Sequence, residues 1–407
     1  MKLLKQKPLI GKDLLTVPVL RETQMLIRSS SATGLFDQAF TETAVDYADF
    51  NAAADAKWYR IEGGMQRLTD GMVDLLESKQ WPKEKGPQLS FKVNYNNPVV
   101  AMADEGDKIS VTVKGQKPEK YDAVFSTTAM GPLQRMDLEG LKLPRPILRG
   151  IRSLSYDRAT KVAIKFKKPW WFEDSDLTKI FGGISSTDLP ISKVVYPSWN
   201  DGPDKPAVLM VSYSWAQDAT RMGSLTPDYT KVKPSKDDEI VRVCFEALAK
   251  LWRARSGPSV QDLYDMYVDH HAWAWSHDPW TAGAFALFGP GQYKDIYPKF
   301  RTLFCDYKLG FVGEALSAHH AWISGAFDSA YVRLWLFLEC NKLLDAQNDL
   351  KESHFGRGSN EHPGEEDEML AKWAAYLSPV LAAQESSKND QAAPATGVPG
   401  GQFAYKY

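Results

Sequence analysis

The sequence predicts a mixed α/β fold in which short strands alternate with amphipathic helices. Two patterns carry this prediction. Tyr121 to Thr128 is an apolar run ending in hydroxyl residues, and Lys161 to Phe166 alternates between apolar and polar positions. Apolar residues also recur at helical spacing, most extensively from Ala326 to about Leu350. At 407 residues the chain can hold two or three domains, or one large discontinuous domain.

The N-terminal part of the chain is expected to be helical. Residues 1–57 are polar and rich in Ala, Asp and Thr, and no chemistry is assigned to them. Trp58 to Ile61 is expected to be a short strand, after which Gly63 and Gly64 turn the chain into a helix. One face of that helix would carry Met65, Leu68, Met72, Leu75 and Leu76.

The middle of the chain reads mainly as strands. Residues 98–102 and 109–113 are expected to pair through the turn at residues 104–107, and residues 121–128 to form a buried strand. Pro144 and Pro146 are interpreted as a linker, and Val208 to Trp215 as a further strand. Ser235 and Asp238 resemble a capping box that starts a helix through Leu251.

Composition narrows the class of protein. A net charge of −2, with 43% apolar and 25% charged residues, gives no global field for nucleic acid or an anionic membrane. The three cysteines, Cys244, Cys305 and Cys340, are an odd and sparse set, which argues against a disulfide framework, and their spacing is not that of a zinc site. The first residues are too polar for a signal peptide, and no run approaches the roughly 20 apolar residues of a membrane span. We therefore expect a soluble, cytoplasmic protein, unless an N-terminal targeting segment has been lost.

The stretch with the clearest chemical content runs from Phe311 to Ala326. A strand that ends at Gly313 lets backbone approach a ligand closely, and Glu314 could accept hydrogen bonds from ribose-like hydroxyls. A helix starting near Trp322 would offer free N–H groups to an electron-rich ring. The alternative is a surface turn with a solvated Glu314.

Other candidate residues also have plain structural explanations. Lys161 shares a strand face with Lys165 and Lys167, which indicates either a solvated face or a lysine whose pKa is lowered by burial at a ligand. The adjacent His319 and His320 diverge and lack a third ligand, so no metal is expected. The 13 Trp residues fit a Trp-rich core or a site for a flat ligand.

Six segments in order resemble the flavin-containing amine oxidoreductases, closest to their L-amino acid oxidase branch. The resemblance covers most of residues 58 to 345 and implies an FAD-linked amine oxidase-like fold, with part of an FAD-binding domain and a mixed-sheet substrate domain. The matching segments are Trp58 to Leu68, Asn97 to Val100, Tyr121 to Thr128, Leu154 to Trp171, Trp275 to Phe285, and Phe311 to Ala326.

The resemblance also implies roles for individual residues. Lys161 would be the catalytic lysine, holding a water near flavin N5. The implied FAD-binding residues are Val99, Trp275, Gly313, Glu314, Trp322 and Ile323. The implied substrate-binding residues are Tyr213, Phe285, Ala321 and Trp322. The implied reaction transfers a hydride from an amine-bearing carbon to FAD, after which the imine hydrolyses and O₂ reoxidises the flavin to give H₂O₂.

The chain departs from this family in two ways. The N-terminal β-α-β unit and its Gly-x-Gly-x-x-Gly loop, which would hold the FAD pyrophosphate, are absent from the sequence, as is a carboxylate-binding arginine. The family has Gly where Ala321 stands. Two further possibilities therefore stay open: a non-catalytic, flavin-free derivative that binds a small ligand or a partner protein, and a homodimer or second chain that supplies the missing FAD-binding part.

The expected domain organisation follows from these segments. Residues 1–57 would be an N-terminal helical segment, and residues 58–145 and 301–350 would be parts of the FAD-binding domain. Residues 146–300 would form the substrate-binding domain. Residues 351–383 would be a linker and terminal helix, and residues 384–407 a disordered tail.

Overall fold

A computed structural model describes residues 38–39, 41–43, 45–46, 49, 59–77, 91–172, 182–199, 201–253 and 256–352. The chain divides into two units, Met1–Ala330 and Tyr331–Tyr407, and each is described by itself. The expected terminal helix and tail lie outside the described residues.

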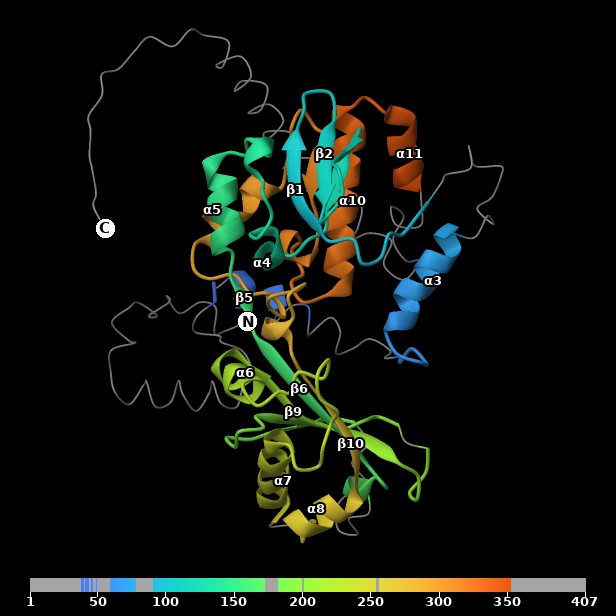
Figure 1. Ribbon diagram of the computed structural model, residues 1–407, viewed down its shortest axis with the longest axis vertical. Coiled ribbons are helices and arrows are strands. Elements are labelled where there is room, and N and C mark those ends of the chain that lie inside the picture. Colours follow the sequence, from blue (N-terminus) through green and yellow to red (C-terminus); the bar gives the residue numbers. More distant parts are fainter. Residues whose placement is uncertain are drawn as a thin grey trace, which may run out of the picture. The chain divides into compact units, whose positions relative to one another are not determined.

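A five-stranded sheet forms the scaffold of one half of the first unit (Figure 1). Its strand order is β10-β6-β9-β8-β7, and the long strands β6, β9 and β10 pair antiparallel. The alternation around residue 161 is reproduced, since Val162, Ile164 and Phe166 are all buried on one face. The strands are β6 (Ala159–Phe166), β7 (Ile184–Ser186), β8 (Lys193–Val195), β9 (Ala207–Trp215) and β10 (Tyr267–Ala274).

Helices cover the apolar face of this sheet. The helix α7 (Glu239–Trp252) buries Ile240, Cys244, Phe245 and Leu248 against the strands, as its sequence pattern predicts. Ahead of it, the backbone N–H of Ser235 donates to Asp238, but the Ser235 hydroxyl accepts from Asp237 and not from Asp238. Only half of the expected capping box therefore forms, and the N-cap of α7 is Asp238. The neighbouring helices are α6 (Ala216–Gly223) and α8 (Val260–Met266).

Much of the tryptophan content belongs to this core. Trp170, on the 3₁₀ helix η5 (Trp170–Phe172), meets Trp171 and Trp252 edge-on, with ring centroids 5.6 and 5.4 Å apart. Edge-to-face packing is the arrangement that aromatic quadrupoles favour. The expected Trp-rich core is therefore present here.

A second core holds three smaller sheets together. The predicted hairpin of β1 (Val99–Asp104) and β2 (Ile109–Val113) is confirmed, and β3 (Glu119–Tyr121) extends it. A second sheet has the order β12-β13-β4, and β11 pairs with β5. The remaining strands are β4 (Val124–Ser126), β5 (Tyr156–Asp157), β11 (Phe285–Ala286), β12 (Leu303–Phe304) and β13 (Leu309–Phe311).

The other helices in the described residues are mostly short. They are α4 (Met130–Leu133), α5 (Arg145–Ser153), α9 (Gln292–Asp295), η4 (Glu139–Leu141), η7 (Trp275–His277), η8 (Tyr297–Phe300) and η9 (Glu314–Leu316). Three longer helices are α3 (Gln66–Glu77), α10 (Ile323–Cys340) and α11 (Leu344–Glu352). The expected helix at residue 66 is thus present, although its apolar face is exposed, with Leu75 55% accessible.

Four sequence predictions about the elements are wrong. Tyr59 to Ile61 is not a strand. Residues 121–128 divide between the exposed β3 and the separate β4. Pro144 and Pro146 do not form a linker, because Pro144 caps α5 and Pro146 occupies its first turn, where a missing N–H costs nothing. The long helix expected from Ala326 ends at Cys340.

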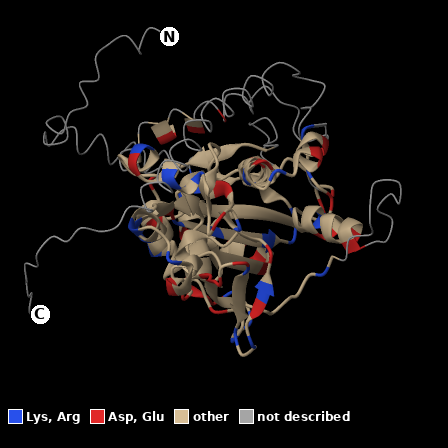
Figure 2. Cartoon of the chain, turned by 90° about the horizontal axis from the view of Figure 1, so that it is seen from above, with Lys and Arg blue, Asp and Glu red and all other residues tan. Residues whose placement is uncertain are grey.

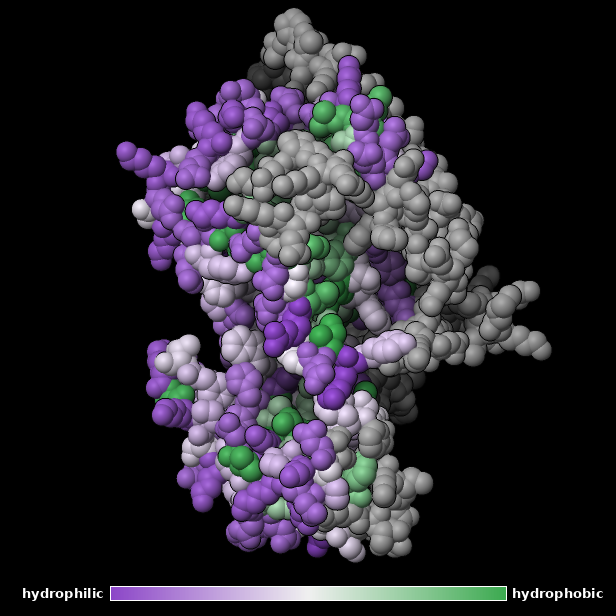
Figure 3. Space-filling model, turned by 90° about the vertical axis from the view of Figure 1, so that its right-hand side faces the viewer, coloured by the Kyte–Doolittle hydropathy of each residue, from purple (hydrophilic) through white to green (hydrophobic). Residues whose placement is uncertain are grey.

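The surface is charged and mixed in sign. Lysines and arginines alternate with acidic residues over the described elements (Figure 2). Apolar residues appear as small groups among hydrophilic ones on the face in Figure 3. No helix within the described ranges combines the length and apolar content needed to cross a membrane.

Candidate active site

Lys161 lies in the middle of the five-stranded sheet with aromatic neighbours on both sides. Its backbone pairs with Tyr213 on β9 and with Trp273 on β10. Side chains directly opposite one another on adjacent strands share a face. The lysine therefore stands between a phenol and an indole instead of among the carboxylates that commonly pair with surface lysines.

The Lys161 ammonium group is half-buried and unpaired. Its Nζ atom lies 4.8 Å from the centre of the Tyr213 ring, and within the described part of the chain it makes no hydrogen bond or ion pair. Burial lowers the pKa of Lys161, because the charged form loses water without gaining an anion. Lys165 on the same strand is exposed, so the solvated-lysine alternative applies to Lys165 and not to Lys161.

A line of aromatic rings leads away from Lys161. Tyr213 meets Trp215 edge-on at 5.6 Å, and Trp215 meets Phe285 at 5.1 Å. Phe285 begins the two-residue strand β11, which pairs with β5. Three residues predicted from the sequence, namely 161, 213 and 285, thus belong to one continuous set of contacts in which Trp215 is the link.

Glu314 joins this line to the loop before α10. One carboxylate oxygen accepts the backbone N–H of Ala286, and the other accepts the backbone N–H of Ala321, both at 3.0 Å. Burial raises the pKa of Glu314, while these two hydrogen bonds oppose the shift. The carboxylate is therefore not a solvated surface group, and its hydrogen bonds connect β11 to the loop.

The backbone on either side of Glu314 adopts unusual conformations. Gly313 has φ 133°, which is open to glycine, and its N–H donates to Ser329 Oγ at 3.2 Å. Ala321 has φ 66°, a left-handed conformation that disfavours any residue with a Cβ. The position where the family resemblance expects glycine thus retains the backbone shape that glycine would favour.

The other predicted residues lie at different distances from this set. Trp275, on η7, meets Trp273 edge-on at 6.0 Å and so borders the Lys161 face. Trp322 is half-buried and Ile323, which begins α10, is 49% exposed. Val99 begins β1, pairs with Val113, and packs against the second core.

The structure adds to this region several residues that were not predicted from the sequence. Trp215 and Trp273 were not singled out, although the alternation of β9 and β10 places them on strands beside Lys161. The segment of residues 41–49 was expected to carry no chemistry, yet Glu42 and Asp49 contact His320 and His319. The sequence pattern that could have indicated them is the set of acidic residues at positions 42, 46 and 49. These positions have the spacing at which side chains of a helix share one face.

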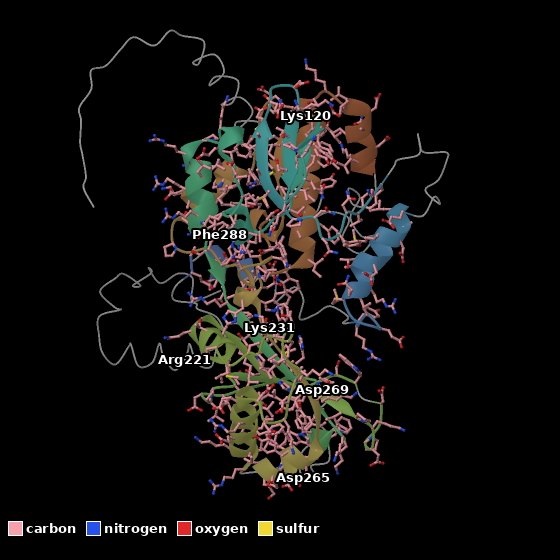
Figure 4. All side chains as sticks on the ribbon, in the orientation of Figure 1. Lys120, Arg221, Lys231, Asp265, Asp269 and Phe288 are labelled. Carbon is pink, nitrogen blue, oxygen red and sulfur yellow. The ribbon has the colours of Figure 1, made fainter. Side chains whose placement is uncertain are left out.

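The two adjacent histidines are held by different carboxylates. His320 is buried, with Nδ1 2.9 Å from both oxygens of Glu42, and its ring meets Phe288 at 4.3 Å (labelled in Figure 4). His319 Nδ1 lies 2.9 Å from Asp49. Among the residues that the structure describes, no group of three or more His, Cys, Asp or Glu side chains could hold a metal ion.

The residues present fit the reactive end of a flavin better than its phosphates. An unpaired lysine and a set of aromatic faces suit a flat, electron-accepting ring, and the glycine at 313 leaves space for close approach. The Gly289–Gly291 stretch is a turn between the two-residue strand β11 and the four-residue helix α9, with Gly291 at φ 84° and with Pro290, which has no N–H to donate, in its middle. It therefore lacks the context of a phosphate loop.

Comparisons with known proteins identify relatives of this chain. A putative bifunctional amine oxidase of Dictyostelium discoideum is 37% identical over 74% of this chain and 27% of its own length. L-amino-acid oxidase 4 of Hebeloma cylindrosporum is 35% identical over 75% of this chain and 48% of its own length. A solved putrescine oxidase bound to putrescine is 16% identical, covers 70% of this chain and 53% of that chain, and gives a TM-score of 0.48.

The chain thus spans a quarter to about half of the length of these two relatives. The family model for flavin-containing amine oxidoreductases matches residues 20–331. This match confirms the resemblance seen in the sequence, together with the fold class and with FAD as the cofactor of the family. Since the match extends over well more than half of its residues, the chain belongs to the flavin-containing amine oxidoreductase family.

Proposed function

We propose that the chain carries the substrate side of an FAD-dependent oxidase that deaminates an amine or an L-amino acid. The observation that carries this proposal is the half-buried Lys161, which has an aromatic ring on each neighbouring strand and no anion beside it within the described ranges. An ammonium group in this position loses hydration without compensation in the protein alone. A ligand that covers Lys161 and interacts with its amine would compensate for this loss of hydration.

The proposed roles of the chain's residues follow from their contacts. Lys161 would hold a water at the ring by donating from Nζ, and its lowered pKa would make the neutral amine more accessible. Tyr213 and Phe285 would bind the substrate, with Trp215 fixing the angle between them. Glu314 would hold Ala321 and Trp322 against the ring by keeping the Ala321 N–H in place.

The proposed cofactor contacts are five of the six predicted from the sequence. Val99, Trp275, Gly313, Trp322 and Ile323 would border FAD. The sixth residue, Glu314, has both carboxylate oxygens engaged by backbone N–H groups and would act on the loop instead. When bound, the flavin would supply the acceptor for a hydride from the amine-bearing carbon, with O₂ accepting the electrons afterwards and becoming H₂O₂. The aromatic walls would exclude water from that carbon until the imine is released for hydrolysis to the keto product and ammonia.

An absorbance titration tests this function. Purified protein is scanned for flavin bands before and after addition of FAD, and H₂O₂ release is measured with a panel of amines and L-amino acids. The matched pair Lys161→Met and Lys165→Met separates the two lysines of β6. We expect the Lys161 variant to lose activity at least about tenfold and the Lys165 variant to keep it.

Two outcomes would contradict the proposal. Protein that gains no flavin absorbance with FAD would indicate a flavin-free derivative that binds some other ligand. Equal activity of the two lysine variants would show that Lys161 has no special role in the reaction.

A further inference from the structure

The loop from Ser317 to Trp322 is attached to a distant part of the chain by two consecutive histidines. Although their side chains diverge, each meets a carboxylate from the same short segment, Glu42 for His320 and Asp49 for His319. Residues 42 and 49 are seven apart in the sequence, and residues 41–43, 45–46 and 49 are helical. One short segment thus supplies the carboxylates for both divergent histidines.

The inner pair is closed off from solvent. His320 is 6% exposed and Glu42 is 3% exposed. Glu42 also accepts the backbone N–H of Phe288 at 2.9 Å, and the His320 ring stacks on Tyr293 with centroids 5.6 Å apart. Breaking a buried, hydrogen-bonded pair leaves one partner uncompensated, which makes such a pair costly to open.

The outer pair is half-exposed and reinforces the same loop. His319 Nδ1 contacts both oxygens of Asp49 at 2.9 and 3.0 Å. The backbone N–H of His319 donates to Ser317 Oγ, and the next residue but one, Ala321, donates to Glu314. Ser317, His319, His320 and Ala321 are therefore each held by a hydrogen bond. The two residues that follow the histidines are Ala321 and Trp322.

Asp46 provides an internal contrast within the same segment. It lies between Glu42 and Asp49 in the sequence, is half-buried, and makes no hydrogen bond to a histidine among the described residues. Burial, with repulsion from Glu42 and Asp49, raises the pKa of Asp46. The charged Asp46 carboxylate therefore destabilises this segment and does not bind it to the loop.

From this arrangement we infer that Glu42 and Asp49 are positioning residues, which hold the His319–Trp322 loop in the shape needed at the ring end of the flavin site. The inference rests on the proposed function for its catalytic consequence. The attachment itself can be tested without any cofactor.

Hydrogen exchange measures the attachment directly. Amide exchange of the peptide spanning residues 317–322 is compared in wild type, Glu42→Gln, Asp49→Asn and the control Asp46→Asn, all without FAD. We expect exchange of this peptide to accelerate roughly tenfold to a hundredfold in Glu42→Gln and less in Asp49→Asn. Asp46→Asn removes the repulsion from Glu42 and Asp49 and should leave exchange of the peptide unchanged or slow it.

The half-exposed pair keeps the test usable if Glu42→Gln fails to fold. The double variant Asp49→Asn with His319→Asn should then exchange no faster than Asp49→Asn alone, because the two changes remove one contact. Unchanged exchange in both Glu42→Gln and Asp49→Asn would overturn the inference, as would equal acceleration in Asp46→Asn.

A second measurement separates this inference from the proposed function. If wild type binds FAD, Glu42→Gln should weaken FAD binding or raise KM for the amine, with Asp46→Asn unaffected. If wild type binds no FAD while exchange still responds to Glu42, the attachment stands and the flavin function fails. If FAD binding and KM are unchanged although exchange accelerates, the positioning role is wrong.

Discussion

Replacing Gly325 with Ala is expected to destabilise the protein by crowding the loop before α10. A Cβ built on Gly325 would lie 2.1 Å from the His319 carbonyl oxygen and 2.5 Å from Ser317 Oγ. Ordinary contact begins at 3.4 Å, so the overlap with the carbonyl exceeds an ångström. Because that oxygen belongs to the backbone, it cannot rotate away as the end of a side chain would.

Two terms set the magnitude. Ala is better than Gly inside a helix by about 1 kcal/mol, whereas inserting a methyl group into a packed site costs about 1–3 kcal/mol. The upper end applies here because Ser317 Oγ and Asp49 both hold His319 in place. The net loss of stability is therefore expected to be about 1–2 kcal/mol.

Gly71→Ala in α3 is the matched control. A Cβ at Gly71 meets nothing within 4 Å, so the same substitution retains only the gain in helix propensity, about 0.5–1 kcal/mol. Urea unfolding followed by circular dichroism should move the midpoint down for Gly325→Ala and up for Gly71→Ala, with similar m-values. A Gly325→Ala midpoint at or above that of wild type would refute the close packing of the loop on the helix.

Three other substitutions are expected to separate structural from chemical roles. Ala321→Gly should stabilise the protein by up to about 1 kcal/mol, because glycine adopts the left-handed backbone of this position without strain. Ala326→Gly in α10 should destabilise it by about 1 kcal/mol, because glycine is a poor helix former. The midpoints of urea unfolding measure both changes. Lys161→Met should be at least as stable as wild type at neutral pH, because burial lowers the folded-state pKa of Lys161. The stability gap should close as pH rises towards the unfolded lysine value of 10.5, which unfolding at several pH values measures. Burial also lowers the pKa of His270, so wild type should lose stability as pH falls below the ordinary histidine pKa of 6.5, and His270→Gln should show a shallower loss. An equal slope in both proteins would exclude His270 as the cause.

Local patterns in the sequence predicted the long strands and the helix α7 well. The alternation around Lys161 and the apolar spacing from Ile240 to Leu248 each reflect one face packed on one core. Such patterns are set by neighbours in the chain, so the sequence carries them directly. The hairpin of β1 and β2 was predictable for the same reason, since its turn lies between the strands.

The wrong predictions concern features set by distant residues. β4 exists as a separate strand because it pairs in parallel with β13, nearly two hundred residues later, and nothing near Val124 signals this. The end of α10 has a local cause that the sequence hides. Lys342 adopts φ 59° and Leu343 donates to the Leu338 carbonyl, the capping pattern that usually uses glycine.

The candidate site shows the same division. The residues predicted for it came from family resemblance, while the contacts that join them came from tertiary pairing. Trp215 and Trp273 were not predicted as site residues because an aromatic residue on a strand is more often part of a core. Glu42 and Asp49 were not predicted to contact the loop because acidic residues at helical spacing usually contact water. Their partners, His319 and His320, lie almost three hundred residues away.

The strand β11 explains how the two halves of the candidate site could act together. The Phe285 side chain extends the aromatic line that begins at Lys161, and the N–H of Ala286 is held by Glu314. A shift of the loop at Ala321 would therefore pull on Glu314, and through Ala286 on the residue that contacts Trp215. The links between Lys161 and Phe285 are side-chain contacts, and those from Ala286 to Ala321 are hydrogen bonds to one carboxylate. Because these contacts form one unbroken series, a change at the loop should alter the surroundings of the lysine, and a change at the lysine should alter the loop.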